Sequence, residues 1–209
     1  MIIIIIDEGG YNSELDKASL LLYRIAQGIN KLIREKGEEN DMSATQIQTV
    51  VFLSGAHPRN KNVGSIARRL QIAQPTASRV VDSLVGKGLV KRQRDEKDRR
   101  RVKLQVTEDG QEVKEEINEI SRVIEGAIRE LSVNRQEALG QDLIKVAGKL
   151  QSQGHLSAAL TCRYCRYFER NGGSTKERPH HCKLTGEDLS EEESYLEWVH
   201  EESGVNMID

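Results

Sequence analysis

The feature that most constrains the fold of this chain is a charged segment held between two short stretches of strand-like sequence. Leu89 and Val90 precede the segment, and the alternating residues 102–106 (Val-Lys-Leu-Gln-Val) follow it. Apolar and polar residues that alternate in this way predict strands with one buried face. We therefore expect a β-hairpin whose tip, Arg94–Arg101, is exposed and rich in arginine.

Two helical patterns precede this hairpin. Asn62 is a suitable N-cap for a short helix, and Pro75 fits the first helical position, where its missing N–H costs nothing. Apolar residues recur on one side of both predicted helices. A helix, a short turn, a second helix and a hairpin together form a winged helix-turn-helix domain, which we place at residues 43–110.

Long apolar stripes flank this domain and predict long amphipathic helices. One small domain cannot cover them all, so we expect a homodimer, the alternative being a monomeric bundle. The predicted fold class is mainly α with a small β-wing. The predicted order is an arm (1–14), a dimerisation helix (15–42), the winged domain (43–110), dimerisation helices (111–153) and a Cys/His extension with an acidic tail (159–209).

Charge is distributed unevenly along the chain. The whole chain of 209 residues has a net charge of −2, but residues 59–103 hold fourteen lysines and arginines against four acidic residues, a local net charge of +10. Residues 183–209 hold nine acidic residues and one lysine. The basic block predicts binding to double-stranded DNA, and the acidic tail is expected to avoid it. No apolar run approaches the ~20 residues of a membrane span, so we expect a cytoplasmic protein.

Base reading is assigned to the start of the second helix, because Gln and Arg make bidentate contacts to adenine and guanine edges. Arginines in the preceding helix suit phosphates, and those of the hairpin tip suit a narrow minor groove. Asp95 and Asp98 are expected to hold the hairpin and orient a neighbouring arginine. The predicted DNA contacts are Arg68, Arg69, Gln74, Thr76, Ser78, Arg79, Arg94, Lys97, Arg99, Arg100 and Arg101.

The same residues resemble the MarR family of bacterial and archaeal regulators. The resemblance covers roughly residues 15–151, and its most specific part is D-x-x-D-R-R at 95–100, followed by a strand and Thr-x-x-Gly at 107–110. It implies a triangular homodimer whose two lobes meet successive major grooves of a palindromic operator. It also implies a repressor that is relieved by a small-molecule effector, an oxidant or a metal.

A cysteine cluster lies outside that resemblance. All three cysteines of the chain occur within residues 162–182. Two of them form a C-x-x-C pair, and a later His-His-Cys run can complete a tetrahedral Cys₃His zinc site of a structural or regulatory kind. An iron–sulfur cluster is disfavoured because only three cysteines exist. The predicted ligands are Cys162, Cys165, Cys182 and either His180 or His181, of which His180 shares a strand face with Cys182.

Two other function classes remain open at this stage. One is a metal- or redox-dependent enzyme that uses the Cys/His site, and the other is a protein-binding adaptor built on the winged helix. The sequence contains no phosphate-binding Gly-rich loop, H-E-x-x-H or G-x-S-x-G motif, so we predict that the chain is not an enzyme. The basic block argues against the adaptor.

Overall fold

The computed structural model describes residues 14–94, 102–157 and 159–199. The chain divides into two compact units, residues 1–44 and residues 45–209. The first unit contains helix α1 (Glu14–Glu39), which agrees with the apolar stripe of the sequence. Leu15, Leu21 and Ile25 on this helix are 75%, 59% and 55% exposed. None of the helices in the described part of the chain is long and apolar enough to span a membrane.

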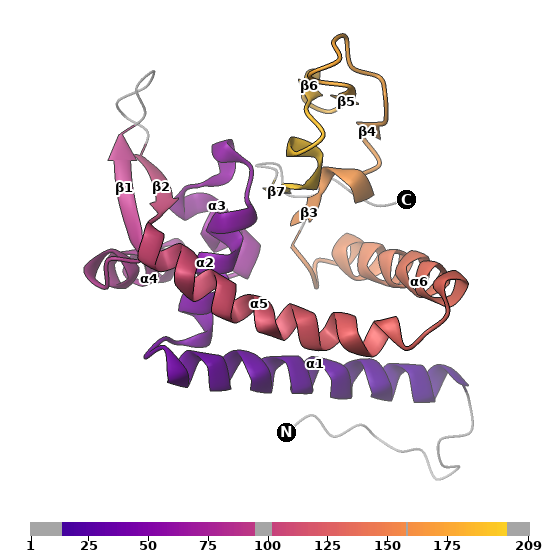
Figure 1. Ribbon diagram of the computed structural model, residues 1–209, viewed down its shortest axis with the longest axis horizontal. Helices are drawn as coiled ribbons and strands as arrows, with labels where there is room; N and C mark the ends of the chain where they lie inside the picture. The colour runs from indigo at the N-terminus through magenta and orange to yellow at the C-terminus, as the bar shows by residue number, and fades with distance from the viewer. Residues whose placement is uncertain (1–13, 95–101, 158, 200–209) are drawn as a thin grey trace. The chain divides into compact units, whose positions relative to one another are not determined.

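The second unit contains the winged helix-turn-helix domain (Figure 1). Its elements follow one another as α2 (Ala44–Gly55), the short 3₁₀-helix η1 (Pro58–Asn60), α3 (Val63–Leu70), α4 (Gln74–Gly86), β1 (Val90–Arg94) and β2 (Val102–Val106). The predicted order of two helices and a hairpin is confirmed.

Local signals set the boundaries of α3 and α4. The Asn62 side chain caps α3 by accepting a hydrogen bond from the backbone N–H of Ser65 at 2.9 Å. Gln71 ends α3 in the left-handed conformation, with φ at 52°. Pro75 lies in the first turn of α4, where no intrahelical donor is lost. The turn between the two helices is therefore specified by residues within it.

The core of the domain lies between the three helices and the base of the hairpin. Helix α4 contributes Ala77, Val81 and Leu84, spaced so that they share one face of the helix. Because this face is fully buried, the rotation of α4 about its own axis is fixed, and its opposite face is held toward solvent. The other fully buried apolar side chains of the domain are Ile47, Val50, Leu53, Ala56, Ile66, Val90 and Leu104.

The hairpin forms the wing. Strands β1 and β2 pair antiparallel from Val90 opposite Val106 to Arg94 opposite Val102. The backbone N–H of Leu104 donates to the carbonyl of Lys61 at 2.8 Å, so the wing is joined to the chain before α3. The predicted alternation is confirmed for Leu104 and Val106, which are buried on either side of the exposed Gln105, but Val102 at the start of β2 is 44% exposed.

The wing is joined at its base to helix α5 (Glu108–Arg129), which is followed by α6 (Val133–Ser152). Thr107 caps α5, since its side chain accepts from the N–H of Gly110 at 3.1 Å and donates to the carbonyl of Gly88 at 2.7 Å. A Cβ atom at Gly110 would clash with the carbonyl oxygen of Leu89 and lie 2.6 Å from Val106 Cγ1. Only glycine allows α5 to approach the wing this closely.

Residues 159–199 form an extension made of short strands. Strand β3 (Ala159–Thr161) pairs antiparallel with β7 (Glu197–Val199), and β4 (Phe168–Glu169), β5 (His180–Cys182) and β6 (Glu187–Leu189) form a three-stranded antiparallel sheet. Two further 3₁₀-helices, η2 (Cys162–Tyr164) and η3 (Glu193–Tyr195), lie between these strands in sequence.

The extension is attached to the winged domain through β7. Ala56 forms a parallel bridge with Glu197, and the N–H of His57 donates to the Glu197 carbonyl at 3.0 Å. The buried side-chain amide of Asn60 then donates to the carbonyl of Val199 at 2.7 Å and accepts from its N–H at 3.1 Å. The Asn60 side chain therefore supplies the two hydrogen bonds that a neighbouring strand would otherwise make with Val199 at the end of β7.

We expect Gly110→Ala to destabilise the fold by about 3 kcal/mol or more, because the added methyl group meets backbone atoms that cannot move aside. Urea unfolding measures the change. Gly126→Ala on the same helix is the matched control, since nothing lies within 4 Å of a Cβ there. That control should be neutral or stabilising by up to about 1 kcal/mol. Equal effects at the two positions would contradict the close approach of α5 to the wing.

We expect Asn60→Ala to cost about 2–4 kcal/mol, because it leaves the backbone donor and acceptor of Val199 buried without a partner. Limited proteolysis should then cut the extension earlier than the winged domain, which keeps its own core. Asn134→Ala, at an exposed position near the start of α6, should change neither the unfolding midpoint nor the cleavage pattern. An Asn60→Ala chain as resistant as the parent would show that β7 is held in some other way.

Candidate nucleic-acid interface

Helix α4 presents a polar face to solvent over its first two turns. Gln74, Thr76 and Arg79 are exposed, and Ser78 is half-buried. Thr76 and Arg79 lie on the side of the helix away from the buried face, whereas Gln74 and Ser78 lie nearer to that face. Four of the predicted base-reading residues thus reach solvent, at least in part, from the first two turns of α4. Their side chains offer the donors and acceptors that base edges in a major groove require.

The middle of α4 is joined to its neighbours by polar contacts. Arg92 of the wing donates from Nη2 to Asp82 Oδ1 at 2.7 Å, and Gln46 of α2 donates to the Ser83 hydroxyl at 2.8 Å. Asp82 therefore has a partner within the protein, and a carboxylate so placed favours a fixed angle between α4 and the wing. Sequence reasoning did not identify the pair of Asp82 and Arg92, which lie ten residues apart.

The two arginines of α3 have different surroundings. Arg68 is exposed, and its Nη2 lies 3.4 Å from the Ser65 hydroxyl. Arg69 is half-buried and forms an ion pair with Glu197 of β7. Burial raises the pKa of Glu197, and the Arg69 guanidinium opposes that shift. Of these two predicted phosphate contacts, Arg68 faces solvent and Arg69 is held by the extension.

The wing contributes Arg94 at the end of β1, where it is exposed. The other predicted wing residues lie outside the described residues, and their assignments stay predictions. These residues are Asp95, Lys97, Asp98, Arg99, Arg100 and Arg101.

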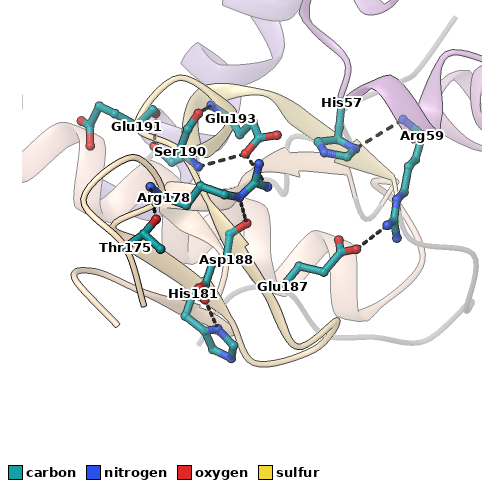
Figure 2. Close-up of polar contacts among 11 residues, drawn as sticks. His57, Arg59, Thr175, Arg178, His181, Glu187, Asp188, Ser190, Glu191 and Glu193 are labelled. Carbon is teal, nitrogen blue, oxygen red and sulfur yellow. Dashed lines mark hydrogen bonds and ion pairs between the residues drawn. The ribbon is translucent and has the colours of Figure 1, made fainter. Parts of the chain in front are cut away.

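A polar network surrounds the attachment of the extension (Figure 2). Arg178 donates from Nε to the Asp188 carbonyl at 2.7 Å and forms an ion pair with Glu193 at 2.8 Å, which holds the loop before β5 against the rest of the extension. Arg59 of η1 forms an ion pair with Glu187 of β6. The acidic tail therefore supplies partners for arginines on both sides of the attachment.

His57 lies at the start of η1, on the winged-domain side of the same network (Figure 2). Its Nδ1 accepts a hydrogen bond from the Arg59 N–H at 3.3 Å. Burial lowers the pKa of His57, although the Glu193 carboxylate acts in the opposite direction. Both the acceptor role and the lowered pKa favour a neutral imidazole at neutral pH, which suits a structural cap at this turn.

The predicted metal ligands lie in the extension. All three cysteines are buried and none forms a disulfide. Burial, and after it the neighbouring Cys182 and Cys165 thiols, raise the pKa of Cys162 to about 12. A thiol so reluctant to ionise is a poor redox nucleophile. Among the residues that the structure describes, no three His, Cys, Asp or Glu side chains already form a metal site.

The two histidines of β5 lie on opposite faces of the strand. His180 is buried on the face of Cys182, its Nε2 lies 2.5 Å from a Glu191 carboxylate oxygen, and its Nδ1 accepts from the Asn171 N–H at 3.3 Å. His181 is half-buried, with Nδ1 2.8 Å from Asp188 Oδ1. The alternation predicted for an extended segment is therefore present.

Comparison with known proteins identifies the winged domain. Residues 40–101 match the model of the MarR family. Among solved structures, a mutant of MepR from a multidrug-resistant Staphylococcus aureus clinical isolate is 26% identical, with a TM-score of 0.54, over 64% of this chain and 96% of that one. A second MepR mutant is 27% identical, with a TM-score of 0.50, over 63% and 97%.

MepR itself, a transcription regulator of the S. aureus multidrug efflux pump MepA, is 25% identical to this chain, with a TM-score of 0.50, over 63% of this chain and 97% of MepR. No curated protein matches the chain significantly. The prediction that the chain is a regulator and not an enzyme is confirmed by the family match. The winged helix-turn-helix domain of this chain therefore matches the MarR family, and its fold is similar to that of the transcription regulator MepR.

Proposed function

We propose that this protein regulates transcription by binding a palindromic operator in double-stranded DNA as a homodimer. The observation that carries the proposal is the exposed polar face of α4, which the buried face of the same helix holds in place beside the wing. In this proposal α4 enters the major groove, while Arg68 and Arg94 contact phosphates or the adjacent minor groove.

The homodimer is proposed from the apolar side chains that a single chain leaves exposed. On α6, Leu143, Val146 and Leu150 are 39%, 43% and 38% exposed, and their spacing places them on one stripe of the helix. Large apolar residues are also exposed on α5 and on α1. A contiguous apolar stripe of this kind is typical of a surface that a partner covers.

The proposed sign of regulation is repression, because a dimer seated across successive major grooves occupies DNA that the transcription machinery must use. A small molecule that alters the separation of the two lobes is the proposed inducer, since operator binding requires a fixed half-site spacing.

We expect Arg79→Ala and Arg94→Ala to affect DNA binding in different ways. Arg79→Ala should cost about 1–3 kcal/mol on the preferred site and relax the preference at one base pair. Arg94→Ala should weaken binding to all sequences and reduce the slope of log affinity against log salt by about 1. Selection from random duplexes followed by salt titration measures both effects.

Arg135→Ala, at an exposed position on α6, is the control for lost positive charge and should leave both the site and the slope unchanged. If Arg79→Ala and Arg94→Ala leave DNA binding as unchanged as the Arg135→Ala control does, the DNA-binding surface lies elsewhere. Binding that does not respond to salt would favour a protein-binding adaptor.

We expect Val146→Glu to shift the dimer toward monomer, because it buries a carboxylate in the proposed apolar interface. Sedimentation velocity measures the shift, and operator affinity should fall with it. Lys145→Glu is the matched control at the adjacent position, where the side chain is 72% exposed. A wild-type chain that sediments as a monomer at micromolar concentration would contradict the proposed dimer.

A further inference from the structure

The three cysteines of the extension converge on one apolar side chain. Cys162 and Cys182 belong to a buried cluster with Leu189, and Cys165 belongs to a second cluster. Phe168 packs against both clusters, and it lies directly opposite Cys182 in the pairing of β4 with β5. Three thiols from a turn and a strand twenty residues apart are therefore held around a single ring.

The backbone around the C-x-x-C pair forms a tight turn, and backbone groups that follow it hydrogen-bond to the sulfur of Cys165. The N–H of Cys165 donates to the Cys162 carbonyl at 2.9 Å. The backbone of Tyr167 and Phe168 hydrogen-bonds to the Cys165 side chain. Such donors stabilise negative charge on sulfur, which a neutral thiol does not carry and a metal-bound thiolate does.

The two neighbouring imidazoles are occupied by other partners. Both ring nitrogens of His180 are in hydrogen bonds, one with a carboxylate and one with a backbone N–H. His181 lies on the opposite face of β5 and is held by Asp188. The imidazoles are therefore committed to other partners. The three sulfurs do not form a metal site as they stand, but each can move by rotation about χ1 without movement of the backbone.

We propose that Cys162, Cys165 and Cys182 bind one thiophilic divalent metal ion, such as Zn²⁺, through their three sulfurs, with water in the fourth position. Each thiol loses its proton to solvent as its sulfur–metal bond forms, so binding releases protons. Three thiolate donors without an imidazole favour a softer ion, and Cd²⁺ should displace Zn²⁺. The site does not depend on the proposed binding of DNA.

The ion would join parts of the extension that are far apart in sequence. Cys162 directly follows β3, which pairs with β7, while Cys182 ends β5 in the other sheet. A metal bound to both therefore ties the two sheets together close to the strand that attaches the extension to the winged domain. Binding should accordingly raise the melting temperature of the extension.

The test uses the full chain, reduced and stripped of metal by a chelator. Titration with Co²⁺ should give sulfur-to-metal charge-transfer bands that saturate at one ion per chain, and Zn²⁺ should remove the bands by displacement. Proton release, measured in weak buffer, should accompany binding. A folded wild-type chain that shows no such bands overturns the proposal, as does purified protein that contains iron and sulfide.

Variants then identify the ligands. Cys162→Ser, Cys165→Ser and Cys182→Ser should each weaken binding beyond the roughly 10–100-fold typical of changes outside the ligand set. His180→Gln and His181→Gln are adjacent in β5 and should both bind the ion as the parent does. Loss of binding in His180→Gln alone overturns the three-sulfur assignment in favour of a Cys₃His site. If a serine variant fails to fold, the intensity of the charge-transfer bands of the wild-type chain still reports the number of thiolates.

Discussion

The attachment of the extension to the winged domain depends on the buried side-chain amide of Asn60. Its two hydrogen bonds to Val199 satisfy backbone groups at the end of β7, far from the winged domain in sequence. The exposed ion pair of Arg59 with Glu187 cannot replace it. Arg59 is 63% exposed in its pair with Glu187, and a pair so exposed contributes about 0–1 kcal/mol. A buried backbone donor and acceptor left without partners cost about 1–3 kcal/mol each. The Asn60 amide therefore contributes more to the free energy that fixes the position of β7 than the exposed ion pair does.

This attachment divides the basic block into two groups. Arg59 and Arg69 are paired with acidic residues of the extension, and Arg92 is paired with Asp82 inside the winged domain. Arg79 and Arg94 are exposed on the surface proposed to meet DNA. The local charge of the sequence thus overstates the charge that a phosphate backbone would meet, because part of it is neutralised within the protein.

The sequence allowed the winged domain to be predicted because its signals are local. Asn62, Pro75 and Thr107 each specify a helix start within a few residues of themselves, and the alternation at 102–106 specifies the buried face of a strand. The polar face of α4 followed from the same periodicity. Attachment of the extension was not predictable in this way, because Asn60 acts on Val199, 139 residues away, and Glu197 acts on Arg69, 128 residues away. The opposite charges of residues 59–103 and residues 183–209 could have indicated that these segments lie together. From the sequence, they predicted only that the acidic tail avoids DNA.

The extension and the surface proposed to meet DNA share one element, helix α3. Arg68 on α3 faces solvent, while Arg69, the next residue, is held by Glu197. Any change that detaches the extension frees Arg69 from Glu197 of β7 and Arg59 from Glu187 of β6. Two positive charges then return to the surface around α3, which strengthens the attraction to phosphate. The same change removes the strand that contacts the turn before α3, so the helix loses a support on that side. The two effects act on DNA affinity in opposite directions. Salt distinguishes them, because only the added charges steepen the dependence of affinity on ionic strength.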